Sequence, residues 1–160
     1  MSDLLNQPRH NESDCLPAAA EKTPDLILSR NKPVLIDALR NVDASGATVC
    51  YSGSGDSGND NEVSILIADG QAFESNTTVT VTTLRSQYVD GQWQTAYVEE
   101  TVSLTQALSD YADRAIEVFH SGFEDGEGGS GEVDFVCETG TVTLDHRDYY
   151  VESAQTVTRL

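Results

Sequence analysis

The sequence predicts an α+β fold, in which a mostly antiparallel sheet of about five or six strands carries two main helices packed on one face. Short segments of alternating apolar and polar residues are separated by turn residues such as Asp90-Gly91, as in antiparallel strands. Two other segments, beginning at Asn31 and at Ser103, carry apolar residues at helical spacing. The 160 residues suffice for one domain with its own core, and no internal repeat divides them.

The domain is expected to occupy residues 23–160. Residues 1–22 mix polar and charged residues with an Ala run, so we expect a disordered or loosely docked tail. Thr23-Pro24 and Asn31-Lys32-Pro33 both resemble helix starts, because Thr and Asn cap helices and Pro fits the first helical position. The second start is favoured by the apolar residues that follow at helical spacing, namely Leu35, Ala38, Leu39 and Val42.

Strands are expected before and after a helix that follows Ser103. Residues 47–51 and 62–68 predict neighbouring antiparallel strands joined by a Gly-rich loop. Residues 77–88 and 92–102 predict a long hairpin, rich in Thr, Val and aromatic residues.

The second helix is expected to begin after Ser103. Gln106 stands three positions later, at the spacing of a capping box, and Gly122 suits the left-handed position beyond the helix end. The strands 132–138 and 141–145 follow, separated by a Thr139-Gly140 turn.

Two acidic, Gly-rich loops are the most informative feature of the chain. They span Tyr51–Glu62 and His120–Asp134, and each adjoins a predicted strand. Glycine at this density allows positive φ and close approach of other groups. Because antiparallel strands bring their connections to common rims of a sheet, we expect the loops to be neighbours, with Asp56 and Glu124 among the closest acidic side chains.

The formal charge of −18, from 27 acidic and 9 basic residues, disfavours direct contact with nucleic acids or anionic membranes. A basic protein or a cation fits better as a partner, although acidity can also serve solubility alone, as in a salty cytoplasm. The sequence shows no apolar leader and no apolar run near the ~20 residues of a membrane helix, so we expect a cytoplasmic protein.

The three cysteines are Cys15, Cys50 and Cys137. They are odd in number and widely spaced, which argues against a disulfide framework and a zinc ribbon. Cys50 and Cys137 lie in apolar strand-like runs, so we expect both to be small core residues.

Three short segments carry a resemblance. Tyr51-Ser-Gly-Ser-Gly-Asp-Ser-Gly58, His120-Ser-Gly-Phe-Glu124 after a helix, and the hairpin ending in Leu144-Asp-His-Arg147 together resemble a small bacterial domain family of unknown function. That family is associated with plasmids, phages and integrated elements. The resemblance covers about residues 31–150 and implies a mobile-element or defence-related setting, without supplying a catalytic residue.

Gly55-Asp-Ser-Gly58 is similar to the serine segment of chymotrypsin-like proteases, but the partners of a triad are missing. If the chain were a small hydrolase or metal-dependent enzyme, Asp56, His120 and Glu124 would be its candidates for acid–base work. We assign no catalytic residue, and the sequence favours a non-enzymatic role.

No cofactor and no dedicated metal site is predicted, because the Ca²⁺-loop pattern is absent. Carboxylates in the loops could bind Ca²⁺ or Mg²⁺ weakly, and the candidates are Asp56, Asp60, Glu62, Glu124 and Asp125. His120 and His146 lack ligand spacing to another His or to Cys, which favours local electrostatic roles over zinc binding. Trp93, Tyr88 and Tyr97 flank a hairpin turn and suit either an interface or cross-strand packing.

The leading hypothesis is an acidic, non-enzymatic protein that binds a basic or nucleic-acid-binding protein, such as a nuclease or CRISPR-type effector. It would act as an inhibitor, immunity protein or DNA mimic. The alternatives are the enzyme described above and an adaptor or structural subunit whose acidity is incidental. The expected binding residues are Tyr51, Asp56, Asp60, Glu62, Trp93, Phe123, Glu124, Asp125 and Glu127.

Overall fold

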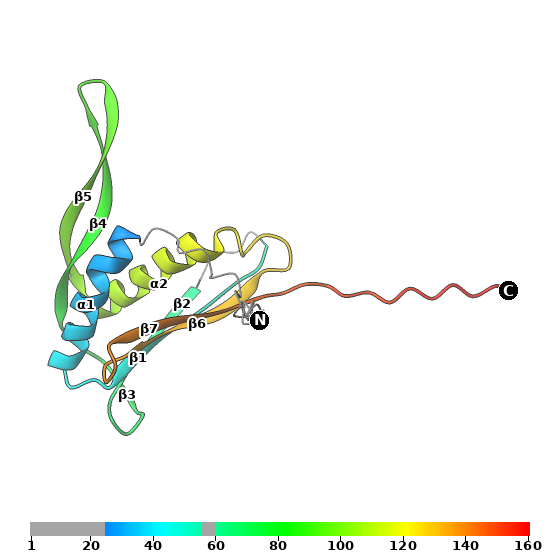
Figure 1. Ribbon diagram of the computed structural model, residues 1–160, viewed down its shortest axis with the longest axis horizontal. Coiled ribbons are helices and arrows are strands. Elements are labelled where there is room, and N and C mark those ends of the chain that lie inside the picture. Colours follow the sequence, from blue (N-terminus) through cyan, green and yellow to red (C-terminus); the bar gives the residue numbers. More distant parts are fainter. Residues whose placement is uncertain (1–24, 56–59) are drawn as a thin grey trace, which may run out of the picture.

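Five strands form an antiparallel sheet in the order β3-β2-β1-β6-β7, and two longer strands form a separate hairpin, β4-β5. The computed structural model describes residues 25–55 and 60–160. Both helices lie on one side of the five-stranded sheet, as Figure 1 shows. The elements in chain order are α1 (Leu26–Asn41), β1 (Gly46–Gly53), β2 (Asp60–Leu66), β3 (Ala72–Phe73), β4 (Thr78–Val89), β5 (Gln92–Ser103), α2 (Leu104–His120), β6 (Gly129–Val136) and β7 (Thr141–Asp148).

This architecture confirms the predicted α+β class, with two helices and a mostly antiparallel sheet. The expected pairing across the first Gly-rich loop is also confirmed, since β1 pairs with β2 in antiparallel register. The two-residue strand β3 was not predicted. In the described part of the chain, no helix has the length and apolar character needed to cross a membrane.

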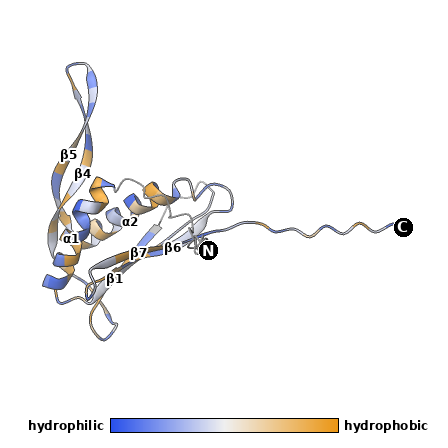
Figure 2. Ribbon diagram, viewed as in Figure 1, coloured by the Kyte–Doolittle hydropathy of each residue, from blue (hydrophilic) through white to orange (hydrophobic). Residues whose placement is uncertain are grey.

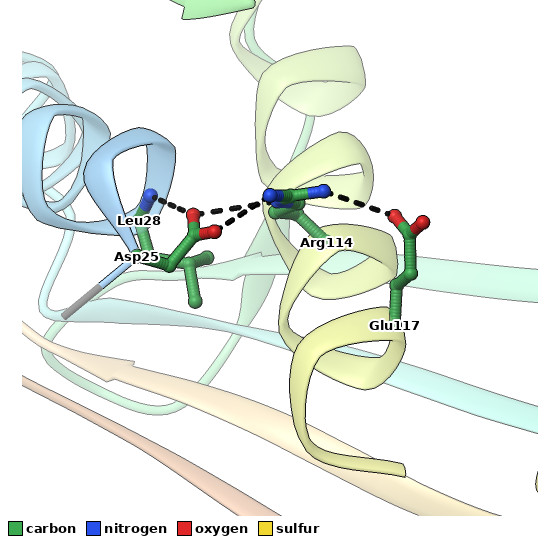
Figure 3. A network of polar contacts seen from close by, with 4 residues as sticks. All are labelled: Asp25, Leu28, Arg114 and Glu117. Carbon is green, nitrogen blue, oxygen red and sulfur yellow. Dashed lines mark hydrogen bonds and ion pairs between the residues drawn. The ribbon is translucent and has the colours of Figure 1, made fainter. Parts of the chain in front are cut away.

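Helix α1 begins at Leu26, earlier than the start at Asn31 that the sequence favoured. Asp25 is its N-cap and accepts a hydrogen bond from the Leu28 N–H at 3.0 Å. The same carboxylate pairs with Arg114 of α2, with 2.6 Å between Oδ2 and Nη2, and Arg114 also contacts Glu117 (Figure 3). The start of α1 is therefore fixed by a cap and by an ion pair to the second helix.

The prediction of a helix start at Asn31 was wrong, because α1 continues through Asn31 and Pro33. Asn31 is buried, and its side chain pairs with the backbone of Thr82 in β4. Its Nδ2 donates to the Thr82 carbonyl at 2.9 Å, and its Oδ1 accepts from the Thr82 N–H at 2.8 Å. A residue typical of helix starts thus joins α1 to the hairpin. Thr23, the other proposed cap, lies outside the described residues.

The β4-β5 hairpin projects beyond α1 (Figure 1). In Figure 2 apolar and polar residues are mixed along both of its strands. Its base is packed, since Val79 and Val81 are buried, whereas its tip is exposed. Tyr88 and Trp93 pair across the strands near the tip, with ring centroids 5.5 Å apart, while Trp93 stays 74% exposed.

Helix α2 follows the predicted start. Ser103 is the N-cap and accepts from the Gln106 N–H at 3.1 Å, whereas the Gln106 side chain donates to Asp110 and does not complete a capping box. Gly122 has the expected positive φ of 78°. The apolar face of α2 enters the core, with buried residues Leu104, Ala107, Leu108, Tyr111, Ala112, Ala115 and Ile116.

The sheet has one face under the helices and one open face. In β1, Val49 and Tyr51 point into the core, and Cys50 between them is exposed. The prediction that Cys50 is a core residue was therefore wrong, because strand alternation turns it to the open face. Cys137 is buried, as predicted.

Candidate functional site

The two Gly-rich loops meet where β1 and β6 run together. Gly53 pairs with Gly129 in the register of the two strands, and a Cβ on Gly53 would lie 3.2 Å from Phe123 and 3.4 Å from Glu124. The expected proximity of the loops is thus confirmed for their described residues. Asp56, which was expected beside Glu124, lies outside the described residues.

His146 is the centre of an aromatic cluster at this rim. Its Nδ1 lies 2.6 Å from the Tyr51 hydroxyl, and its Nε2 lies 2.9 Å from Asp148 Oδ1. The His120 ring stacks on it, with centroids 3.9 Å apart and planes inclined by 20°. The Phe123 ring meets it edge-on at 5.3 Å. The His146 side chain is only 3% exposed, so it is held from several sides.

The glycines of β6 make room for this cluster. A Cβ on Gly131 would come within 3 Å of the Tyr51 hydroxyl and of the Asp145 carbonyl. A Cβ on Gly129 would crowd the Arg147 carbonyl, the Phe123 ring and His146. Gly129 and Gly131 let the aromatic rings pack closely against β6. Any side chain at these two positions would prevent this packing.

The hydroxyl of Tyr51 stays protonated at neutral pH. Burial, with a smaller contribution from the nearby Asp145 and Asp148 carboxylates, raises the pKa of Tyr51 to about 12. In one tautomer of His146, Tyr51 donates to Nδ1 while Nε2–H donates to Asp148, and all three groups are satisfied. The cluster can therefore orient an imidazole between a hydroxyl and a carboxylate.

A second feature lies on the open face of the sheet. One row across β2, β1, β6 and β7 contains Glu62, Cys50, Glu132 and Asp145, which are paired in register. In the next row Asp134 accepts a hydrogen bond from Thr48 at 2.7 Å. We call the four carboxylates of these rows, Glu62, Glu132, Asp134 and Asp145, the acidic open face.

Three of the four carboxylates of the acidic open face, Glu62, Glu132 and Asp145, line a pocket. Its volume is about 470 Å³, and its lining includes Cys50, Glu62, Glu132, Asp145 and Arg147. Although Cys50 is exposed, the partial burial of its thiol is the main factor that raises the thiol pKa, and the carboxylates of Glu132, Glu62 and Asp134 raise it further. The raised pKa disfavours the thiolate, which is the nucleophilic form of Cys50. The carboxylates around Cys50 instead favour a positively charged group at this place.

The residues predicted to bind a partner do not lie together in one place. Glu62 is on the acidic open face, and Trp93 is at the hairpin tip, which Figure 1 places away from the loops. Tyr51 and Phe123 are buried in the aromatic cluster. The second loop holds the half-buried Glu124 and the exposed Asp125 and Glu127. The backbone of Asp60 begins β2, opposite Ser52.

Sequence reasoning missed several residues of both features. His146 was assigned a local role, yet it stacks on His120 from a distant part of the chain. Asp148 was not considered, and Asp145 was noted only as a neighbour of His146. Glu132 and Asp134 were placed in the second loop and in the strand 132–138, but no shared face of the sheet was assigned to them. Strand alternation in 129–136 and 141–148 was the available signal, because it separates Glu132, Asp134 and Asp145 from His146 and Asp148.

The model of a protein family whose function is unknown matches residues 27–159 of the chain. The chain belongs to this family, DUF6878. The matched region contains β1 to β7, α2 and all of α1 except its first residue, and thus the aromatic cluster and the acidic open face. Searches of curated proteins and of solved structures find no match.

Proposed function

We propose that this protein binds a basic protein through the acidic open face of its sheet. The observation that carries the proposal is the row Glu62, Glu132 and Asp145, which places carboxylates across strands β2, β6 and β7 of one sheet. Both helices occupy the opposite side (Figure 1). The acidic open face is therefore not covered by either helix.

A sheet offers these charges on a rigid frame. Neighbouring strands lie about 4.8 Å apart and alternate residues on one strand about 7 Å apart, so the four carboxylates form a closely spaced array. Such an array attracts a Lys- and Arg-rich surface, accelerates its encounter and fixes its register. The net charge of −18 adds to this attraction and repels nucleic acids.

A nucleic-acid-binding protein is the partner class with the required basic surface. Its cleft is built to receive phosphates, and a carboxylate array can occupy such a cleft as an inhibitor, immunity protein or DNA mimic does. The mobile-element setting implied by the sequence resemblance makes nucleases and CRISPR-type effectors the first partners to test.

The test compares the chain with two variants of equal net charge. The open-face variant carries Glu62→Gln, Glu132→Gln, Asp134→Asn and Asp145→Asn. The charge-matched control replaces four exposed acids elsewhere, with Asp69→Asn, Glu99→Gln, Glu138→Gln and Glu152→Gln. Both change the formal charge from −18 to −14.

Binding to purified basic nucleases and CRISPR-type effectors is measured by calorimetry or pull-down at low and high salt. Exposed ion pairs contribute about 0.2–1 kcal/mol each, so loss of four should weaken binding on the order of 10-fold or more. The control variant should bind nearly as the native chain does, and salt should weaken every complex. Equal losses in both variants, binding indifferent to salt, or binding to a DNA duplex instead would contradict the proposal.

A further inference from the structure

We propose that His120, His146 and Asp148 form a binding site for a divalent transition metal ion, with Zn²⁺ the best fit. One ligand atom from each of the three residues lies within 4.8 Å of the others. The last residue of α2 meets alternate residues of β7 here, so tertiary structure assembles the site. This site is on the helix side of the sheet, separate from the acidic open face.

The separation between the His146 and Asp148 ligand atoms suits a tetrahedral ion after a small adjustment. Zinc binds imidazole nitrogen and carboxylate oxygen at about 2.0–2.2 Å, which places two ligand atoms roughly 3.3 Å apart. His146 Nε2 and Asp148 Oδ1 are 2.9 Å apart, so they need to separate by only a few tenths of an ångström.

The His120 ring has to turn out of its stack, because nearly parallel rings do not direct their nitrogens to one point. His120 is half-buried at the end of α2 and borders a pocket of about 410 Å³ between that helix and β7. The pocket gives the ring space to turn. Asp148, with a side chain 70% exposed, leaves a path for the ion.

The surroundings of His146 match those of a metal-ligating histidine. Such a residue commonly donates its second ring N–H to an acceptor that fixes the ring. With an ion on Nε2, the Nδ1–H of His146 would donate to the Tyr51 hydroxyl, which accepts as readily as it donates. Phe123 supplies an apolar wall beside the same ring. Tyr51 is thus a positioning residue for the proposed ligand.

The donor set selects the ion. Two imidazoles and one carboxylate favour Zn²⁺ over Mg²⁺ and Ca²⁺, which prefer sites made of oxygen ligands. Three protein ligands leave a fourth tetrahedral position for water. The proposal therefore differs from the weak Ca²⁺ or Mg²⁺ binding expected at loop carboxylates.

The test is a calorimetric titration of the chelator-treated, full-length chain with Zn²⁺ in excess Mg²⁺, which occupies exposed carboxylates. We expect one Zn²⁺ per chain. His120→Gln and Asp148→Asn should each weaken binding more than ~10-fold, since even loss of an outer-shell partner costs about 10–100-fold. Tyr51→Phe should fall within that outer-shell range.

Two matched controls distinguish this site from other ligands of the chain. His10→Gln removes the third histidine, and Asp69→Asn removes an exposed carboxylate that belongs to neither site. Both should retain binding, and thermal unfolding without metal checks that every variant is folded. Absence of one-site Zn²⁺ binding, equal displacement by Mg²⁺, or equal binding by His120→Gln, Asp148→Asn and the controls would overturn the proposal.

Discussion

Asp25 is both the cap of α1 and the partner of Arg114. Its side chain is 13% exposed and that of Arg114 is 27% exposed, so water screens this pair less than a surface ion pair. The hydrogen bond from Arg114, the largest factor, holds the pKa of the Asp25 carboxyl below its usual value of 3.8. Ionised Asp25 thus stabilises the contact between α1 and α2.

This lowered pKa predicts a pH-dependent effect of Asp25→Asn. Asparagine caps helices about as well as aspartate, so the substitution removes mainly the charge. We expect a loss of about 1–2 kcal/mol in the free energy of unfolding at pH 7. Because the folded pKa is depressed, the contribution is complete above the unfolded value and is lost as pH falls through the folded value. Urea unfolding at neutral pH and below pH 3.8 measures the difference.

Asp37→Asn is the control for this prediction. Asp37 faces Arg40 at 3.8 Å on the exposed side of α1, and its substitution should change stability by less than ~0.5 kcal/mol. An Asp25→Asn effect that is the same at neutral and acidic pH would show that the ion pair is not its source.

Single residues also show the limit of sequence reasoning. Cys50 lies in an apolar run, and composition alone does not tell which face of a strand it occupies. Once the covered face of the sheet is known, the alternation of Val49, Cys50 and Tyr51 along β1 shows that Cys50 lies on the open face. The stacking of His120 on His146 has no local signal, because it depends on where α2 ends relative to β7.

At the scale of elements, Asn31 is the connection between α1 and the hairpin. Asn31→Ala would leave the N–H and C=O of Thr82 without their side-chain partner. We expect a loss of about 1–3 kcal/mol in the free energy of unfolding, the usual cost of unsatisfied buried polar groups. Hydrogen exchange should also accelerate at the Thr82 amide. Lys32→Ala, one position along the same helix, is the control and should leave that amide unchanged.

The elements themselves were largely predictable. The hairpin, α2 and the strand pairs have strong periodicity and local turn or cap residues, such as Asp90-Gly91 and Ser103. The start of α1 was not predictable, because Asn31 and Pro33 carry the local pattern of a helix start. Pro in a helix interior costs about 3 kcal/mol, which contacts such as the Asn31 pair and the Asp25–Arg114 pair help to offset.

For the whole molecule, the clustered negative charge that would attract the proposed basic partner opposes the folded state. Glu132 and Asp145 stand directly opposite each other in the sheet, and like charges in such pairs destabilise by roughly 0.2–1 kcal/mol. With a net charge of −18, longer-range repulsion adds to this cost. A surface kept for binding commonly lowers stability in this way.

The open-face variant should therefore be more stable than the native chain. We expect its free energy of unfolding to rise by about 0.5–1 kcal/mol at low salt, and by more than that of the charge-matched control, because its four removed charges are clustered. Raising NaCl to about 1 M shortens the Debye length to about 3 Å, so the advantage should shrink as salt screens the native chain. Urea unfolding of the three proteins at both salt concentrations measures this. Equal gains in the two variants would assign the effect to net charge and remove the acidic open face as its source.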